Sequence, residues 1–425
     1  MLAKKFSLTK KIKIKGLVQG VGFRPFVYKL AKELSLSGWI RNTNESVEIV
    51  ASGEKSALSD FVRKIEQNSP GLAEIYTIEA QDIDFVEYQN FTIKPSVVTS
   101  GRITNISPDI AVCEQCLVDL KHQEHRIYYP FINCTNCGPR FTIIKGLPYD
   151  RIQSTMSAFK LCDICYSEYK DIEDRRFHAQ PIACKTCGPH YTLLTKGLEI
   201  KDFKTIISHI SQLIDSGGIV CMKGLGGYNL TCDAMNEQAV LKLREIKRRE
   251  GKPFVMMVRD INTVIRNFYV CENEQEVLHS PRRPVLLIKP KSHLHFPAEI
   301  NKGLDSHGVL LPYLPLHYLL FEKLKTDTIV FTSANLTDEP IVKDDSEAIR
   351  KFSGLTAGVL FNNREIYNRC DDSVSRVING RERIIRRSRG YVPAPLNLDL
   401  NVEGILATGA ELRNTFCIGK GQQAI

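Results

Sequence analysis

The sequence predicts a multidomain α+β protein in which a ferredoxin-like domain, a duplicated zinc-ribbon domain and a mixed α/β domain follow one another. Three observations lead to this fold class. The chain has 425 residues, which is too long for one ordinary core and suggests roughly three domains. Its hydrophobic periodicity changes twice, and eight of its thirteen cysteines lie in C-x-x-C pairs between the two changes.

The first domain is expected at residues 8–97, where the elements follow the order β-α-β-β-α-β. Strands are indicated by KIKIKGLVQ, by SVEIVASG and finally by FTIKP. Helices are indicated by PFVYKLAKEL, with proline in its first turn, and by KSALSDFVRKIEQN. This order is typical of a ferredoxin-like sandwich.

The second domain is expected at residues 104–195, where periodicity disappears and an internal repeat begins. Each copy of the repeat has two C-x-x-C pairs, separated by 17 residues in the first copy and 18 in the second. The two sets are Cys113, Cys116, Cys134 and Cys137, and Cys162, Cys165, Cys184 and Cys187. Four thiolates close a tetrahedron around zinc and leave no open position, so two structural zinc ions are predicted. The ligands can pair within or across the repeats, and a substitute role for His178 stays open.

The third domain is expected at residues 200–395, where helices alternate with the apolar strands GGIVCMKGL, RPVLLIKP and TIVFTSAN. Alternation of this kind favours a mixed α/β sheet with helices packed on it. Residues 396–425 are expected to form a linker and the start of a truncated further unit.

The composition is that of a globular protein, with 43% hydrophobic and 25% charged residues and a formal charge of +9. The N-terminus has no apolar signal region with a cleavage site, and no run of 18 apolar residues follows. We therefore expect a cytoplasmic protein without a membrane partner. Paired cysteines in such a chain indicate metal binding rather than disulfides.

A glycine-rich turn near the N-terminus combines several features of a phosphate site. The stretch GLVQGVGFR lies between the first strand and the first helix, and GWIRNT follows on the next strand. Both stretches resemble the acylphosphatase signature. Backbone N–H groups beside a helix N-terminus form a nest for phosphate, and an arginine can clamp it bidentately. The loop residues are Gln19, Gly20, Val21, Gly22 and Phe23.

The acylphosphatase resemblance implies that Arg24 binds the substrate and that Asn42 positions the nucleophilic water. One departure follows Asn42, where the turn reads TNES and the family usually has a glycine. Asn44 can adopt the left-handed conformation instead, because asparagine tolerates positive φ.

The third domain resembles the YrdC/Sua5 family, which makes carbamoyl-type adenylates from ATP. The resemblance rests on MKGLGGYNLTCDAMNEQAVLKLREIKRREGKPF and TSANLTDEP, with YNRCDDSVSR and RRSRGYVP adding dense charge. It implies that cations neutralise the triphosphate, that hydroxyl and amide groups bind phosphate or acyl oxygens, and that magnesium accompanies ATP. The candidate residues are Lys247, Arg249, Lys252, Ser333, Asn335, Arg369, Asp371, Asp372, Arg387 and Arg389.

Taken in order, the three domains closely resemble the HypF family of [NiFe]-hydrogenase-maturation carbamoyltransferases. Shared phrases include NCTNCGPRFTI, LPYDR, RRFHAQP and RRSRGYVPAP. The resemblance implies a relay in which carbamoyl phosphate is hydrolysed and the carbamate reacts with ATP to give carbamoyl-AMP. The carbamoyl group then passes to the C-terminal cysteine of the partner HypE, as a step in cyanide-ligand synthesis. Because ATGAELRNTFC resembles only the opening of the family's Kae1-like domain, the final transfer is expected to be absent.

Two other functions stay open at this point. YrdC-type domains also serve tRNA threonylcarbamoyl adenylate synthesis, although the fused acylphosphatase and zinc repeat speak against that reading. A zinc-ribbon nucleic-acid-binding protein is a further alternative. The ribbon lacks interleaved aromatic and basic residues, so no nucleic-acid partner is expected.

Overall fold

The computed structural model describes residues 7–98, 105–336, 339–409 and 416–425. The chain divides into two compact units, each with its own internal contacts. The first unit contains residues 1–107, 133–136 and 143–182. The second unit contains residues 108–132, 137–142 and 183–425. Among the described residues, none of the helices combines the length and hydrophobicity that a membrane crossing requires.

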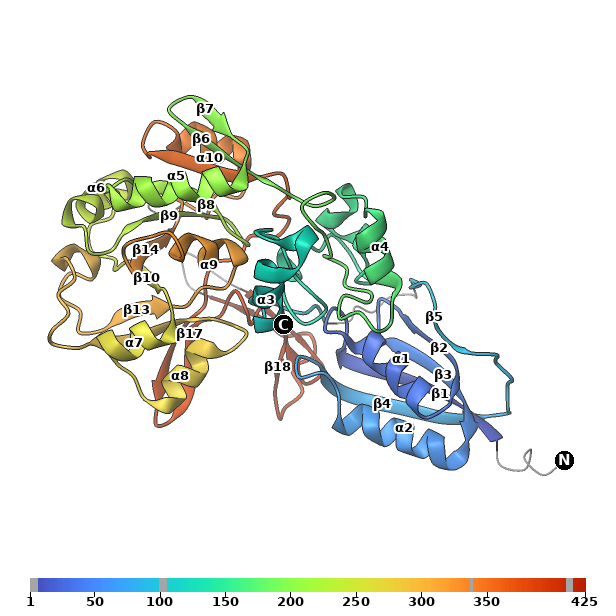
Figure 1. Cartoon of the computed structure of the whole chain (residues 1–425). Coiled ribbons are helices and arrows are strands. Elements are labelled where there is room, and N and C mark those ends of the chain that lie inside the picture. Colours follow the sequence, from blue (N-terminus) through green and yellow to red (C-terminus); the bar gives the residue numbers. More distant parts are fainter. Residues whose placement is uncertain (1–6, 99–104, 337–338, 410–415) are drawn as a thin grey trace. The chain divides into compact units, whose positions relative to one another are not determined.

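The first unit contains a five-stranded sheet with two helices packed on it (Figure 1), which includes the ferredoxin-like sandwich that the sequence predicts. The strand order β4-β1-β3-β2 is that of a ferredoxin-like sandwich, and β5 adds a parallel edge strand beside β2. The elements are β1 (Ser7–Leu17), α1 (Phe23–Glu33), β2 (Ser37–Asn42), β3 (Val47–Glu54), α2 (Lys55–Gln67), β4 (Glu74–Ile83) and β5 (Phe91–Ile93).

The strand FTIKP, expected to close this domain, is the extra edge strand β5 rather than the fourth strand of the sandwich. The fourth strand is β4, which pairs with β1 through antiparallel hydrogen bonds. All ten residues of β4 are exposed or half-exposed. Its sequence therefore lacks the strict alternation that reveals a half-buried strand.

The zinc-ribbon region, residues 105–195, is called the finger segment, and it contains short helices that begin directly after a cysteine. Cys113 is the N-cap residue of α3 (Glu114–His122), and Cys162 is the N-cap residue of α4 (Asp163–Lys170). Between them the backbone forms 3-10 turns rather than longer elements. These turns are η1 (Glu124–Arg126), η2 (Phe141–Ile143), η3 (Arg151–Gln153) and η4 (Thr155–Ala158).

The second unit is built on a twelve-stranded mixed sheet in the order β17-β16-β12-β13-β10-β14-β9-β8-β15-β6-β7, with β11 paired to β12. The strands are β6 (Tyr191–Thr195), β7 (Leu198–Ile200), β8 (Val220–Lys223), β9 (Tyr228–Asp233), β10 (Val255–Val258), β11 (Phe268–Tyr269), β12 (Val285–Pro290), β13 (His307–Leu310), β14 (Thr328–Ser333), β15 (Gly358–Asn362), β16 (Val374–Ile378) and β17 (Arg381–Arg386). Three neighbouring pairs are parallel (β10 with β13, β12 with β16, β15 with β8), and the others are antiparallel. The expected mixed sheet is therefore present, and it begins at β6, within the residues 104–195 that were assigned to the zinc-ribbon domain.

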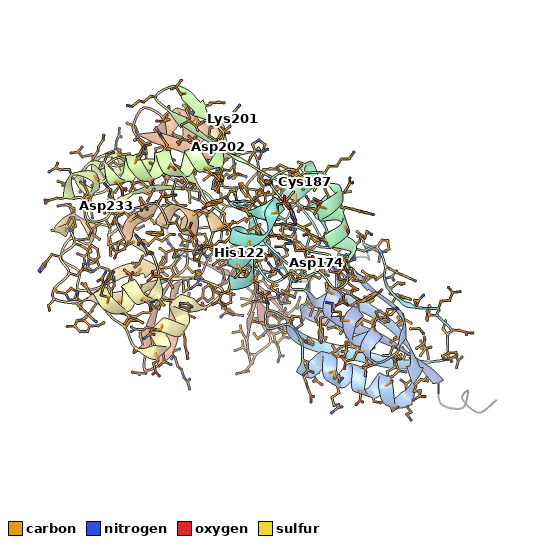
Figure 2. All side chains as sticks on the ribbon, viewed as in Figure 1. His122, Asp174, Cys187, Lys201, Asp202 and Asp233 are labelled. Carbon is orange, nitrogen blue, oxygen red and sulfur yellow. The ribbon has the colours of Figure 1, made fainter. Side chains whose placement is uncertain are left out.

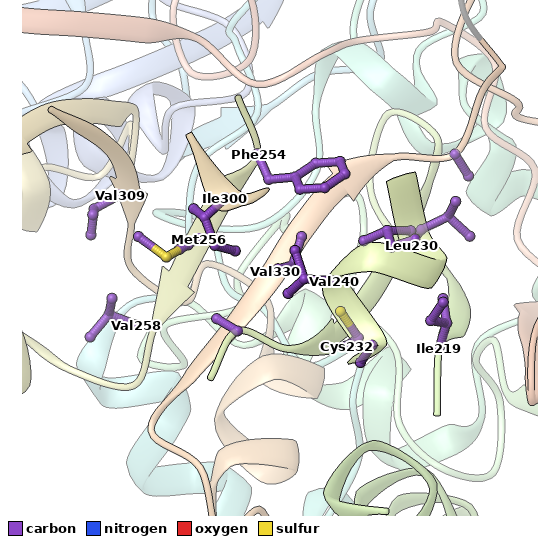
Figure 3. Close-up of a cluster of buried hydrophobic side chains, with 14 of the residues drawn as sticks. Ile219, Leu230, Cys232, Val240, Phe254, Met256, Val258, Ile300, Val309 and Val330 are labelled. Atoms are coloured by element: carbon purple, nitrogen blue, oxygen red, sulfur yellow. The ribbon is translucent and has the colours of Figure 1, made fainter. Parts of the chain in front are cut away.

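Helices pack against this sheet and close its core. They are α5 (Phe203–Asp215), α6 (Glu237–Lys247), α7 (Ile261–Asn267), α8 (Glu272–His279), the 3-10 turn η5 (Ala298–Ile300), α9 (Pro315–Phe321) and α10 (Asp345–Phe352). Asp202, labelled in Figure 2, caps α5 by accepting a hydrogen bond of 2.8 Å from the Thr205 N–H. Figure 3 shows the core, where Met256 of β10 and Val330 of β14 lie in one buried cluster with Val240 of α6.

A small four-stranded sheet ends the chain. Its order is β18-β21-β20-β19, and its strands are β18 (Leu396–Asn397), β19 (Leu406–Thr408), β20 (Phe416–Lys420) and β21 (Gln423–Ala424). The stretch ATGAELRNTFC, predicted to open a further domain, lies partly outside the described residues.

Candidate functional site

The glycine-rich turn connects the end of β1 at Leu17 to the start of α1 at Phe23. Gly20 and Gly22 have φ values of 75° and 76°, a left-handed conformation that side chains with a Cβ rarely adopt. Gly22 is the N-cap residue of α1. The first N–H groups of an 11-residue helix therefore begin at this turn, where they have no partner within the helix.

Asn42 is the last residue of β2, and its neighbour Thr43 is hydrogen-bonded to the glycine-rich turn. The Gln19 side chain donates a hydrogen bond of 2.7 Å to the backbone oxygen of Thr43, which directly follows Asn42. Asn42 is almost fully buried, and its Oδ1 atom has no hydrogen-bond partner among the described residues. A buried acceptor without a partner is costly, so this atom is suited to receive a hydrogen bond from a water or a ligand.

Arg24 follows the turn in the first helical turn of α1, and only 9% of its side chain is exposed. Its Nη2 atom lies 2.9 Å from Oδ1 of Asp150, and its Nη1 atom lies 3.4 Å from Oγ of Ser96. Arg24 in α1 directly follows the turn, and Asn42 at the end of β2 precedes the residue to which the turn is hydrogen-bonded. It also adds a carboxylate that the sequence analysis did not single out.

His178 is a neutral histidine in the same unit. Burial lowers its pKa to about 3, and the positive charges of Arg24 and Lys170 contribute. Its ring packs against Tyr169 and Phe177, with centroids 4.9 and 4.6 Å away. His178 belongs to neither group of candidate metal ligands among the described residues.

The eight paired cysteines form two groups that follow the repeats. Cys113, Cys116, Cys134 and Cys137 form one, and Cys162, Cys165, Cys184 and Cys187, the last labelled in Figure 2, form the other. Within each group the sulfur atoms all lie within 4.8 Å of one another. The open question of pairing is thereby answered, because each group draws its ligands from a single repeat.

The spacing of the sulfurs fits a tetrahedral zinc site. Zinc–sulfur bonds of about 2.3 Å imply sulfur–sulfur edges of roughly 3.8 Å in a tetrahedron. The Sγ atoms of Cys116 and Cys137 are 3.6 Å apart, and those of Cys184 and Cys187 are 3.8 Å apart. Four thiolates in this arrangement hold zinc structurally and leave no position for a substrate.

Buried arginines link each repeat to the second cysteine pair of the other. Arg126, from the first copy, donates from Nε to the backbone oxygen of Ala183 at 3.0 Å. Arg176, from the second copy, donates from Nε to the backbone oxygen of Asn133 at 3.2 Å. Ala183 and Asn133 each directly precede a zinc-ligating cysteine. The repeats are thus bonded to each other beside their metal sites.

A cavity of about 260 Å³ opens over the mixed sheet of the second unit. Five of the sequence-predicted nucleotide residues line it, namely Arg249, Lys252, Ser333, Asp371 and Asp372. The walls also contain apolar side chains and glycines, which let a ligand approach the backbone closely. Cations and carboxylates therefore face one concave space, although they are more than 100 residues apart in sequence.

Lys247 and Asn335 support the cavity from behind its wall. The buried Lys247 ammonium donates to the backbone oxygens of Ser333 and Asn335 at 2.5 and 2.9 Å. The Ser333 hydroxyl donates to Oδ1 of Asn335 at 2.7 Å. These bonds connect Lys247 to the turn that presents Ser333 to the cavity.

The remaining predicted arginines lie outside the cavity lining. Arg389 is fully buried, and its Nε lies 2.6 Å from Oδ1 of Asp372. Arg369 donates to the backbone oxygen of Ile341, and Arg387 donates to the backbone oxygen of Tyr391 at 3.1 Å. Arg389 therefore positions Asp372, which itself reaches the cavity.

Sequence reasoning missed several cavity residues. Arg386 lines the cavity and precedes the predicted Arg387, so the run RRSRGYVP signalled the segment but not which arginine faces inward. Thr332 also lines it, and although it opens the TSANLTDEP stretch, only Ser333 and Asn335 of that stretch were candidates. Tyr313 lines it as well and was not a candidate. Cys370 also lines it, but burial raises the pKa of its thiol to about 12. Its sulfur is therefore protonated at neutral pH and is no nucleophile.

Comparison with known families gives three matches along the chain. The family described as Acylphosphatase matches residues 10–93, and the family described as HypF finger matches residues 112–144 and 161–194. The Sua5/YciO/YrdC family, described as Telomere recombination, matches residues 212–388.

Relatives with a known name match nearly the whole chain. Carbamoyltransferase HypF of Rhodobacter capsulatus is 39% identical over 98% of this chain and 55% of its own length. Carbamoyltransferase HypF of Synechocystis is 39% identical over 97% of this chain and 54% of its own length. A crystal structure of full-length HypF in the phosphate- and nucleotide-bound form has a TM-score of 0.94 and 44% identity, covering 98% of this chain and 55% of that one.

The chain spans about half the length of the curated relatives it matches. Within that span it carries the acylphosphatase, finger and Sua5/YrdC matches in one order, on a backbone that superposes on HypF. The chain therefore belongs to the HypF family.

Proposed function

We propose that this chain hydrolyses carbamoyl phosphate at the glycine-rich turn and converts the resulting carbamate to carbamoyl-AMP in the cavity of the second unit. In the first step a water oxygen attacks phosphorus, the bond between phosphorus and the acyl oxygen breaks, and carbamate and phosphate form. In the second step a carbamate oxygen attacks the α-phosphorus of ATP, and pyrophosphate leaves.

The observation that carries this proposal is the presence of both kinds of site in one chain of the HypF family. The turn holds an arginine and a buried, unpartnered amide oxygen next to a helix N-terminus. The cavity holds cations beside carboxylates in a volume of about 260 Å³. The similar full-length HypF structure is described as phosphate- and nucleotide-bound, which matches the ligands proposed for these two places.

At the turn, Arg24 binds the phosphoryl group and Asn42 Oδ1 orients the attacking water. A guanidinium offers five N–H donors in a planar fork, which suits phosphate oxygens. The backbone N–H groups of the turn and of the first turn of α1 hold the remaining oxygens. Charge on phosphorus oxygens grows in the transition state, so these donors lower the barrier as well as bind.

In the cavity, Arg249, Lys252 and Arg386 neutralise the triphosphate, while Ser333 hydrogen-bonds a phosphate or acyl oxygen. Asp371 and Asp372 line the same space and are suited to hold magnesium with ATP, since Mg²⁺ prefers oxygen ligands from one or two carboxylates plus phosphates. Magnesium supplies charge neutralisation when it is bound, and Arg389 holds Asp372 in place.

The carbamoyl group is destined for the C-terminal cysteine of HypE, following the relay of the HypF family. The proposed setting is the cytoplasm, where ATP and carbamoyl phosphate are available. We expect this stretch of chain to form carbamoyl-AMP. The tRNA-modification alternative is not favoured, because the relatives that match nearly the whole chain are HypF proteins.

Two assays on one preparation test the proposal. The first follows phosphate release from carbamoyl phosphate, and the second follows ATP–pyrophosphate exchange stimulated by carbamoyl phosphate. We expect both reactions, with the exchange depending on carbamoyl phosphate and not on threonine with bicarbonate. Exchange driven only by threonine and bicarbonate would replace the proposal with the tRNA alternative. Absence of both reactions would overturn it.

A further inference from the structure

The carboxylate beside Arg24 comes from a distant part of the chain. Asp150 is the first residue after Tyr149 in the LPYDR stretch, and 126 positions separate it from Arg24. Both residues belong to the same compact unit. The ion pair joins Nη2 of Arg24 and Oδ1 of Asp150 at 2.9 Å. It is the one ion pair of Arg24 among the described residues, and the contact with Ser96 at 3.4 Å is weak.

Asp150 is held firmly where it meets Arg24. The N–H of Tyr149 donates to Oε1 of Gln19 at 3.2 Å, which ties this segment to the phosphate turn. On the other side, Arg151 donates to the backbone oxygens of Gln180 and Ile182 at 2.7 and 2.8 Å. The backbone of Asp150 is therefore fixed between two anchors, one on the turn and one on the finger segment.

Two residues of the first cysteine repeat, Thr135 and Asn136, also approach the same turn. A Cβ placed on Gly22 would lie 3.3 Å from Oδ1 of Asn136 and 3.7 Å from Cβ of Thr135. Glycine at position 22 is thus favoured both by its positive φ and by this close approach. Two separate pieces of the finger segment therefore reach the phosphate turn, and the pair with Asp150 is not an isolated surface contact.

A buried guanidinium needs a partner that stabilises its charge and holds its orientation. The planar fork of arginine has two edges, so one N–H group can serve a carboxylate while the others remain for a phosphate. Asp150 takes Nη2 through Oδ1, and its Oδ2 makes no further hydrogen bond among the described residues. The carboxylate is only 27% exposed, which leaves the pair less screened than a surface ion pair.

We propose that Asp150 is a positioning residue of the acyl-phosphate site, which holds the Arg24 guanidinium in the orientation that receives the phosphoryl group. The inference rests on the proposed function of the turn. It makes the finger segment a part of that site as well as a zinc-bound scaffold. Misplacement of a binding group by about 1 Å can cost a factor of roughly 100 in rate, so the effect of losing Asp150 is measurable.

The test compares Asp150→Ala and Asp150→Asn in the full chain with carbamoyl phosphate as substrate. Asparagine keeps an oxygen that accepts from Nη2, whereas alanine removes it. We expect Asp150→Ala to lower kcat at least tenfold and Asp150→Asn to keep kcat within about threefold of the wild type. Glu173→Gln is the matched control, because Glu173 lies 3.9 Å from Lys29 of the same helix α1 but is exposed.

Folding is checked in each variant by zinc content and by the fluorescence of Trp39, the single tryptophan, which lies on β2. The positioning role is overturned if Asp150→Ala keeps the wild-type kcat, or if both Asp150 variants lose the same activity while folded. If Asp150→Ala fails to fold, the comparison of Asp150→Asn with the wild type decides. An asparagine variant that is folded but tenfold slower would then overturn the proposal.

Failure of the inference differs from failure of the proposed function. A wild-type chain that releases no phosphate from carbamoyl phosphate would remove the proposed function itself. A wild-type chain that is active, with an equally active Asp150→Ala variant, would remove only the role of Asp150.

Discussion

The two candidate sites are assembled from the chain in different ways. The cavity of the second unit is lined by residues between 226 and 386, a single stretch of sequence that forms most of one sheet. The phosphate turn draws on residues 19–24, on Asn42 and on Asp150, so three distant segments meet there. The turn also has one principal cation with a carboxylate partner, whereas several cations and two aspartates surround the cavity.

This difference matches the ligands proposed for the two sites. A small acyl phosphate can be held by one guanidinium and a helix N-terminus, because a few donors saturate its oxygens. A triphosphate carries more charge and needs cations spread over a larger volume. We therefore expect single substitutions to affect the turn strongly and the cavity more gradually.

The largest effect is expected from Arg24→Ala. Loss of the principal cation of the turn should lower phosphate release from carbamoyl phosphate by about 10³-fold or more, through transition-state stabilisation. ATP binding, measured by calorimetry, should stay within twofold. Arg63→Ala is the control, because Arg63 is an exposed arginine on α2 of the same domain. If Arg24→Ala lowered ATP affinity as much as it lowered phosphate release, the turn and the cavity would not be separate sites.

A smaller effect is expected from Arg249→Ala in the cavity. Arg249 bonds the backbone oxygens of Lys252 and Pro253 at 2.9 and 2.6 Å and also lines the cavity. Its loss should slow ATP–pyrophosphate exchange by roughly 100-fold, because other cations of the cavity remain. Phosphate release should be unchanged.

The control for Arg249 is Arg266→Ala, which removes an exposed arginine of α7 that pairs with Asp327. This variant should leave both reactions at the wild-type rate. If Arg249→Ala slowed phosphate release as much as exchange, the cavity and the turn would not be separate sites.

The third prediction concerns the fingers. Cys165→Ser removes one of the four ligands of the second group and should reduce bound zinc from two ions per chain to one, measured by mass spectrometry. Phosphate release should fall about tenfold, because the finger segment carries Asp150, while ATP binding stays within twofold. Cys271→Ser, at an exposed cysteine outside both groups, should change neither. Two zinc ions retained in the Cys165 variant would contradict the assignment.

The smallest effect is a pH dependence confined to the first unit. The pKa of His178 is lowered to about 3 by burial and by nearby positive charge, against 6.5 for the unfolded chain. Below pH 6.5 the unfolded state therefore binds a proton that the folded state does not, and stability falls as pH drops towards 3. The slope from one such group is at most about 1.4 kcal/mol per pH unit.

His178→Asn should remove this slope, and asparagine suits the positive φ of 54° at this position. Urea unfolding followed by Trp39 fluorescence at pH 7.5 and 5.5 measures the difference in the first unit. His122→Asn, at the exposed histidine labelled in Figure 2, is the control and should not change the slope. An unchanged slope in His178→Asn would show that His178 is not the titrating group.

The sequence predicted the fold class and the zinc sites because their signals are local. The glycines of the turn, the C-x-x-C pairs and the alternating strands each need only neighbouring residues to be recognised. The sequence predicts FTIKP, the edge strand β5, as the fourth strand because β4 exposes most of its residues and alternates weakly. Alternation of apolar and polar residues therefore does not reveal a strand whose residues are mostly exposed.

Contacts between distant segments had no signal in a single sequence. Asp150 stands 126 positions from Arg24, and nothing in LPYDR distinguishes a partner of Arg24 from a helix-capping aspartate. In RRSRGYVP the structure places Arg386 at the cavity and Arg389 against Asp372. Which arginine faces the cavity depends on the pairing of β16 with β17, where a register shift lies beside Val374.

By itself, then, the sequence determined the order of the domains, the zinc-binding residue types and the glycines that form the turn before α1. Each of these depends on backbone conformation or ligand chemistry over a few neighbouring positions. Only the tertiary structure decided that each zinc group stays within its repeat, that Lys247 is hydrogen-bonded to the turn carrying Ser333, and that Asp150 is the partner of Arg24. These contacts depend on how distant segments pack. A buried charged group is stable only where a partner from another segment reaches it.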